Sequence, residues 1–125
     1  MRFIRLLTLL SLLVLFGLLS SCDKYRAKKL SGTYYCSVNY HYTDISPETI
    51  DSTYNEDIII EQDDKDVIVL GTSINIDSLW KEKEYFEGNY NDFLQVLFRN
   101  DSVYIQKYSG GLGGSSSLTY KGLKE

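Results

Sequence analysis

Few side chains in this sequence can carry covalent chemistry: two thiols, Cys22 and Cys36, and one imidazole, His41. Nucleophilic catalysis needs a base beside a serine or cysteine, and a lone histidine without a Gly-x-Ser-x-Gly turn offers no such pair. His41 lies five residues after Cys36, and an odd offset along a strand places two side chains on opposite faces. We therefore expect no catalytic residue, and the strongest chemical signal is at Cys22.

Cys22 ends an N-terminal segment that has the three parts of a secretory signal: a basic start, a short apolar core and small residues before a cut. Two arginines precede the apolar run Leu6–Leu19, and Ser20 and Ser21 follow it. A membrane-spanning helix is the alternative. Fourteen residues rise only about 21 Å as a helix, whereas the hydrocarbon core is ~30 Å thick. The run therefore predicts a signal helix that is removed, residues 1–21.

The order Leu19-Ser20-Ser21-Cys22 resembles the lipobox of bacterial lipoproteins. An ordinary signal peptide with a chance cysteine is the alternative, but the motif abuts the apolar run without a spacer. The resemblance implies export, removal of the leader, and a diacylglycerol plus usually an N-acyl chain on Cys22. Two or three chains would hold the protein on a bacterial membrane, whereas one binds only marginally. The outer membrane is favoured, and Asp23, which resembles an inner-membrane retention signal in some bacteria, leaves the inner membrane open.

The charge of the mature chain restricts its partners. Without Arg2 and Arg5 it keeps 11 basic residues against all 17 acidic ones, a formal net charge of −6. Proteins that bind nucleic acid present basic faces, so we expect no nucleic-acid partner. Four of the basic residues fall in residues 22–30, which we interpret as a lipidated cysteine and a tether beside the membrane, or else a solvated linker. Residues 31–125 are enough for one domain.

Alternation of apolar and polar residues predicts strands through most of that domain. From Gly32 one face carries Tyr34, Cys36, Val38, Tyr40 and Tyr42. The other face carries Tyr35, Asn39 and His41, an exposed polar-aromatic strip that is our candidate binding surface. Cys36, on the apolar face, is expected to be a small buried hydrophobe. The motif analysis adds no metal site and no cofactor, because the acidic cluster around Asp63 lacks the glycine and closing glutamate of a calcium loop.

Further along the chain, residues 56–61 and 67–70 predict a hairpin, and strands follow at 73–76, 93–99, 103–108 and 117–121. Residues 44–51 and the glycine-rich residues 110–114 are expected to be loops, with a turn at Asn100-Asp101. Two predictions remain for residues 77–92. One is a short helix capped by Ser78; the other, which we favour, is a strand that starts irregularly and turns at Gly88-Asn89. The predicted fold is all-β, an antiparallel meander of six to eight strands curled into a small barrel or sandwich after an N-terminal signal helix.

If the last strand pairs with the first, Gly32-Thr33-Tyr34 and Tyr120-Lys121-Gly122 lie on one seam. These tripeptides resemble the ends of short β-rich lipoproteins of Gram-negative bacteria, some of them lipocalin-like. The lipocalin Gly-x-Trp signature is absent, so ligand transport is not carried over. The sequence predicts a membrane-anchored, non-enzymatic binding or structural module whose partner is an envelope protein or glycan. The alternative is a lipocalin-like carrier of a small apolar ligand, which needs an internal cavity of ~300 Å³ or more.

Overall fold

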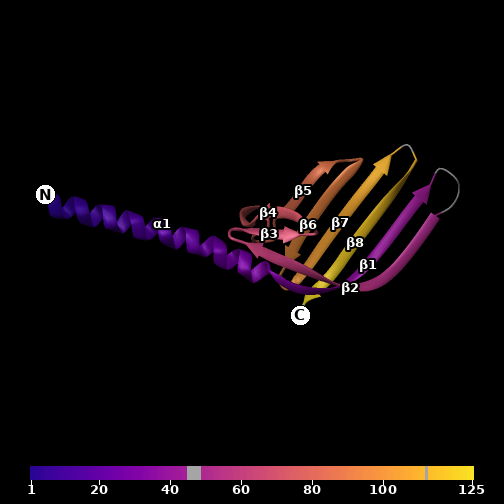
Figure 1. Cartoon of the computed structure of the whole chain (residues 1–125), viewed down its shortest axis with the longest axis horizontal. Helices are drawn as coiled ribbons and strands as arrows, with labels where there is room; N and C mark the ends of the chain where they lie inside the picture. Colours follow the sequence, from indigo (N-terminus) through magenta and orange to yellow (C-terminus); the bar gives the residue numbers. More distant parts are fainter. Residues whose placement is uncertain (45–48, 112) are drawn as a thin grey trace.

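The computed structural model describes residues 1–44, 49–111 and 113–125, with only the backbone for residues 19–21. A long helix, α1 (Arg2–Leu30), projects away from a strongly curved β-sheet (Figure 1). The described residues form eight strands: β1 (Gly32–Asp44), β2 (Thr49–Asp63), β3 (Asp66–Val69), β4 (Thr72–Asn75), β5 (Glu84–Asn89), β6 (Asp92–Arg99), β7 (Ser102–Gly111) and β8 (Gly114–Lys124).

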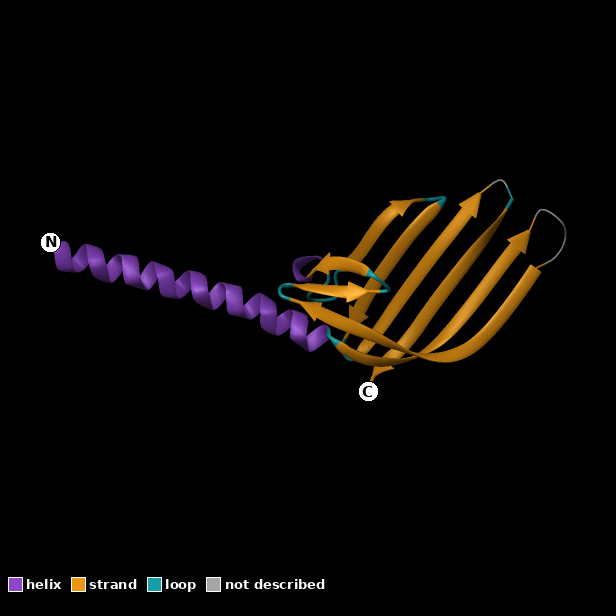
Figure 2. Cartoon of the chain, viewed as in Figure 1, coloured by secondary structure: helices purple, strands orange, loops and turns teal. Residues whose placement is uncertain are grey.

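All strand pairs are antiparallel and belong to one sheet with the order β4-β3-β2-β1-β8-β7-β6-β5. The sheet curls into a nearly closed barrel, with β3 and β4 folded over the end next to α1 (Figure 2). The predicted all-β antiparallel meander is therefore confirmed, and the single curved sheet makes it barrel-like. Tight turns between consecutive strands account for this order, because they join antiparallel neighbours.

The first and last strands meet, as their sequences allow. Cys36 pairs with Gly122 and Val38 with Tyr120 in the β1–β8 ladder. This ladder closes the chain on itself, so the sheet edges are β4 and β5, the strands on either side of the irregular segment 76–83. The gap in the barrel therefore lies between β4 and β5, in the middle of the chain, and not between the first and last strands.

Several expected loops are shorter than predicted. Strand β7 continues to Gly111, and β8 already begins at Gly114. Residues 114 and 115 pair with the end of β1 through backbone groups, which need no side chain. Strand β2 already begins at Thr49. Residues 45–48 of the predicted loop at 44–51 lie outside the described residues, and so does residue 112. The turn at Asn100 is confirmed, and Asn100 has the left-handed φ of 54° that asparagine tolerates.

The uncertain segment 77–92 contains a strand, as favoured, but both ends differ from the prediction. A short 3-10 turn, η1 (Ile76–Ser78), begins after Asn75, whose side chain accepts from the backbone N–H of Asp77, so Ser78 starts no helix. β5 runs from Glu84 to Asn89. Its turn follows at residues 90–91, where the Asn89 side chain accepts two backbone N–H groups at 2.9 and 3.2 Å. An Asx turn therefore replaces the expected Gly88-Asn89 turn.

The core is the inner face of the barrel, together with the end of α1. It includes Tyr34, Cys36 and Val38 of β1, as the alternation predicts. Ala27 and Leu30 are buried in the same cluster, so the last turns of α1 plug one end of the barrel. Residues 23–30 are therefore helical and pack on the barrel, which a solvated linker, the alternative to a tether beside the membrane, would not do. The spacing of the half-buried positions 23 and 26 and the buried positions 27 and 30 is that of one helix face.

Candidate functional site

Cys22 lies within α1 with its side chain exposed to solvent. Leu19, Ser20 and Ser21, the cleavage signal, are helical in the backbone, and their side chains lie outside the described residues. The described side chains of residues 1–18 are all exposed, and an 18-residue window of α1 has a mean hydropathy of 2.3. By length and composition alone this helix is able to cross a membrane. The apolar run itself is the fourteen residues counted in the sequence, and the helix continues beyond it to Leu30 through the charged segment of residues 23–29.

The predicted strip of Tyr35, Asn39 and His41 lies on the outer face of β1, as expected. Tyr35 is 52% exposed. The Asn39 amide donates to the Thr53 hydroxyl of β2 at 3.4 Å. Along the strand, Tyr35 is four residues from Asn39 and six from His41. Because a strand rises ~3.3 Å per residue, Tyr35 lies about 13 Å or more from both. The structure therefore places Asn39 and His41 together and leaves Tyr35 at a distance.

Neighbouring strands extend this strip across the sheet. The pairing registers bring Asn39 and His41 into two transverse rows on the same outer face, which we call the outer platform. The first row consists of Phe86, Gln95, Gln106, Thr119, Asn39 and Thr53. The second row consists of Phe93, Tyr108, Ser117, His41 and Asp51.

Three aromatic rings form one side of the outer platform. Phe93 stacks on Phe86 and on Tyr108, with both pairs of ring centroids 5.3 Å apart and interplanar angles of 29° and 21°. Phe86 remains 53% exposed, and Phe93 and Tyr108 are half-buried. The part of the sheet under these rings is a single layer, so an apolar side chain on its outer face has no second sheet to pack against. An exposed aromatic cluster of this kind commonly marks a binding surface.

His41 is held between a carboxylate and a hydroxyl. Its Nδ1 contacts the Asp51 carboxylate, and its Nε2 lies 3.0 Å from the Thr43 hydroxyl. Because a carboxylate only accepts, Nδ1 donates to Asp51, and for a neutral ring Nε2 accepts from Thr43. This order of groups matches a nucleophilic triad. The His41 and Asp51 side chains are 44% and 67% exposed, however, and a triad acts where water is excluded. We interpret the contacts as orienting a polar imidazole within the outer platform.

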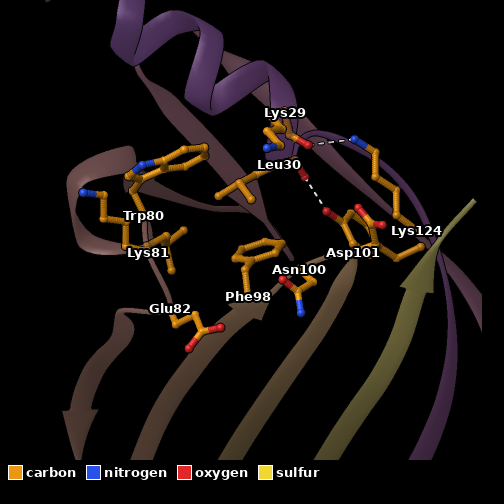
Figure 3. Close-up of a pocket in the computed structure, with 11 residues that line it drawn as sticks. Lys29, Leu30, Trp80, Lys81, Glu82, Phe98, Asn100, Asp101 and Lys124 are labelled. Carbon is orange, nitrogen blue, oxygen red and sulfur yellow. Dashed lines mark hydrogen bonds between the residues drawn. The ribbon is translucent and has the colours of Figure 1, made fainter.

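A pocket of about 540 Å³ lies where α1 meets the barrel, and we call it the basal pocket (Figure 3). Figure 3 shows Lys29 and Leu30 above it, the segment from Trp80 to Glu82 on one side and Lys124 on the other. Lys81 and Glu82 both have left-handed φ angles, 64° and 62°. Non-glycine residues rarely adopt this backbone region and cluster at functional sites when they do. No sequence motif predicted this pocket, because its residues come from segments far apart in the chain.

Tyr34 lines the basal pocket and connects β1 to the end of α1. Its hydroxyl donates to the Leu30 carbonyl at 2.8 Å. Burial, with smaller contributions from Asp101 and Cys36, raises the pKa of Tyr34 to about 12. The phenol therefore stays protonated, and able to donate, at any physiological pH.

The acidic residues around Asp63 serve structural contacts. Asp64 pairs with Lys24 of α1 at 3.2 Å, and Asp66 accepts from Ser73 and Asn75 of β4. Within the described ranges, no group of three His, Cys, Asp or Glu side chains is arranged to hold a metal ion.

The inner face of the barrel is filled by side chains in the part nearer α1. Farther from α1, Ile50 and Tyr54 of β2 lie on the same face and are 51% and 43% exposed. Five hollows of about 280 to 610 Å³ lie on the described part of the chain, and all of them open to solvent. The largest, lined by Tyr35, Leu97 and Tyr104 among others, is on the outer face. None of the five is the enclosed apolar chamber that a carrier of the lipocalin type requires.

Cys36 is fully buried and, apart from a contact with the Tyr34 carbonyl, is surrounded by core side chains. Burial raises the pKa of its thiol, and the nearby Asp57 and Glu56 carboxylates raise it further. The thiolate is the reactive form, so this cysteine is chemically inert in the folded protein.

We therefore expect Cys36 to react with a thiol reagent only when the barrel opens. In a Cys22→Ala chain at pH 8, labelling in native buffer should be at least a hundredfold slower than in guanidinium chloride. Raising the pH to 9 should raise the native and the denatured rates by the same factor, because the thiolate forms only in the opened chain. Rapid native labelling with a midpoint near the ordinary thiol pKa of ~8.5 would contradict the burial of Cys36.

No family model matches this chain, and no match was found among curated proteins or solved structures. Its function must therefore be argued from its own residues.

Proposed function

We propose that the protein is an exported, lipid-anchored and non-enzymatic binding module of the bacterial envelope. Cys22 carries the lipid, residues 1–21 are the removed leader, and the barrel of residues 31–125 faces the aqueous side. The observation that carries this proposal is a 29-residue helix whose described side chains up to Leu18 are all exposed and which holds Leu-Ser-Ser-Cys at the end of its apolar run. Apolar side chains of this number are not stable in water, so the segment is either removed or inserted in a membrane.

Mass spectrometry of the mature N-terminus tests the anchoring. The expected peptide starts at Cys22 and carries a diacylglycerol, with or without an N-acyl chain. A mature chain that keeps residues 1–21, with Cys22 unmodified, would show that α1 is a permanent membrane anchor and would overturn the proposal.

The outer platform is the proposed binding surface, and a glycan is its proposed ligand. The first row has no charged residue: one phenylalanine, three side-chain amides and two threonine hydroxyls. Amides and hydroxyls donate to and accept from neighbouring sugar hydroxyls, while the C–H faces of a sugar ring pack on aromatic rings. The stacked rings beside the amides thus suit an uncharged polyhydroxylated chain lying across the strands.

Replacing Phe93 by alanine should remove the middle ring of the stack and most of the binding. A single aromatic contact of this kind is worth ~0.5–1.5 kcal/mol, so we expect affinity to fall about three- to tenfold. The measurement is co-sedimentation of the lipid-anchored protein, in detergent, with purified peptidoglycan sacculi and with insoluble chitin, two glycans that contain N-acetylhexosamine. Tyr25→Ala is the matched control, because Tyr25 is an exposed aromatic residue of α1 outside the platform. Equal sedimentation of wild type and Phe93→Ala, or none of either, would exclude this surface as a glycan site.

A further inference from the structure

The hollow of about 610 Å³ on the outer face lies between the outer platform and the end of the sheet next to α1. Four apolar or aromatic side chains of that face line it, one from each of four neighbouring strands. They are Tyr35 of β1, Leu123 of β8, Tyr104 of β7 and Leu97 of β6, and we call them the apolar band. The register pairs Tyr35 with Leu123 and Tyr104 with Leu97 in adjacent rows, so the band crosses the strands obliquely.

The apolar band is open to solvent. Tyr35 and Leu123 are 52% and 66% exposed, and Leu97 and Tyr104 are half-buried. A contiguous apolar surface of this kind is unfavourable in water and marks a site where something binds. Four strands spaced ~4.8 Å apart make the band about 14 Å long, and it is one side chain wide. A single hydrocarbon chain lying across the strands has this shape.

The charged residues among the described lining of the hollow are Lys121 and Arg99, and both are cationic. They flank the band on opposite sides: Lys121 lies two residues before Leu123 on β8, and Arg99 lies two residues after Leu97 on β6. The hollow is therefore positive in a chain whose net charge is −4.

Three acidic residues come near the hollow without lining it: Asp57, Glu84 and Glu82. Asp57 lies on β2, beyond Tyr35. Glu84 accepts from the Gln95 amide, and Glu82 pairs with Arg99 at 3.9 Å. The charge of Arg99 is thus already answered by a carboxylate, and Lys121 is the cation that a ligand would meet.

Lys121 has no acidic partner in the ion pairs of the described side chains. Its neighbours across the strands are Ser37 and Tyr104, and its amine lies 5.9 Å from the centroid of the Tyr104 ring. The neighbours on the same face of β8 are Thr119 and Leu123, which are uncharged as well. An ammonium group in this position can pair with the anionic group of a ligand whose apolar part lies on the band.

We propose that the apolar band and Lys121 bind a free long-chain carboxylate. Its hydrocarbon chain lies across β1, β8, β7 and β6, and its carboxylate pairs with the Lys121 ammonium. The occupant is one amphipathic anion and not a bilayer, because the band is one side chain wide and one unpaired cation lies beside it. The inference is independent of the anchor at Cys22 and of glycan binding, because it uses neither Cys22 nor the outer platform.

Photolabelling of the full lipidated chain tests this site. The protein is reconstituted in phosphatidylcholine nanodiscs and irradiated with a palmitate that carries a diazirine on its chain, or with the methyl ester of that probe. We expect mass spectrometry to find the label on residues of the apolar band, at least threefold more from the acid than from the ester, and displaced by unlabelled palmitate. Equal labelling by acid and ester, or no labelling of the band, would overturn the inference. So would labelling by a diazirine phosphatidylcholine that palmitate does not displace, because it would show a membrane on this face.

Matched charge reversals separate a specific ion pair from a general effect of charge. Lys121→Glu should weaken labelling by the acid at least fivefold, because an attraction becomes a repulsion, and should change labelling by the ester less than twofold. Lys107→Glu is the control, since Lys107 is an exposed lysine on the inner face of β7 and the change in net charge is the same. Leu123→Ser, at an exposed position, should weaken labelling by both probes. Unaltered labelling of Lys121→Glu, or an equal loss in Lys107→Glu, would contradict the site.

Discussion

Cys22→Ala should abolish acylation and release the exported protein from the membrane. The thiol is the atom that carries the diacylglycerol, and no other described cysteine is accessible, since Cys36 is fully buried. Each buried methylene of an acyl chain contributes ~0.8 kcal/mol, so the loss of two or three chains removes tens of kcal/mol of membrane affinity. The four basic residues of the segment 23–30 cannot replace that anchor. The measurement is the intact mass of the protein together with its distribution between membrane and soluble fractions.

Cys36→Ala is the matched control for this experiment. It removes the other thiol of the chain and should keep the acyl mass and the membrane location, although it leaves a small gap in the core. The proposal fails if Cys22→Ala retains acyl mass, or if the wild-type chain has none. Membrane-bound Cys22→Ala protein that has lost residues 1–21 would be equally damaging, because it would show an anchor elsewhere.

The features that could be predicted from the sequence are those that depend on neighbours along the chain. Alternation identifies Tyr34, Cys36 and Val38 as inner residues because a strand has a period of two, whatever its partners are. The turn at Asn100 follows from one residue's tolerance of positive φ. The segment of residues 77–92 was harder, since its conformation depends on Asn75 and Asn89, whose side chains bind the backbone of the turns that follow them.

The outer platform could not be predicted in full, because it is built across strands. The alternation placed Asn39 and His41 on the polar face of one strand. Their neighbours Gln106 and Tyr108 come from β7, nearly 70 residues later, and reach them only through the β1–β8 register. One residue of slip in that register would turn these side chains to the inner face. Pairing register is a property of the folded sheet, and a single sequence does not specify it.

The packing of residues 23–30 as the end of α1 could not be predicted for a different reason. Its residues were interpreted by charge, and four basic residues in seven suggested a solvated segment. The same segment contains Ala27 and Leu30 at helical spacing, but two apolar positions are weak evidence for a buried helix face until the surface they pack against is known. The charges fit the packed helix as well, because Arg26 and Lys29 place their cationic groups over Trp80.

Gly122→Ala should be among the most destabilising single substitutions in the barrel. Gly122 lies opposite Cys36 in the ladder that joins the first and last strands. A Cβ at this position would overlap the Cys36 sulfur and lie 2.6 Å from the Tyr35 carbonyl oxygen. The second contact is with backbone, so no side-chain rotation relieves it and the β1–β8 ladder must shift. Overpacking of this kind costs typically ~1–3 kcal/mol, and we expect the upper end of that range.

Thermal unfolding measures the effect. At ~4–8 °C per kcal/mol for a domain of this size, the midpoint should fall by roughly 10–20 °C. Gly111→Ala is the matched control: its Cβ would meet no atom within 4 Å, so the midpoint should change by only a few degrees. Combining Gly122→Ala with Cys36→Ala removes the clash with the sulfur but not that with the Tyr35 carbonyl. The double variant should therefore recover part of the loss, and full recovery, or a Gly122→Ala midpoint equal to that of the control, would show that the two strands are not packed in this register.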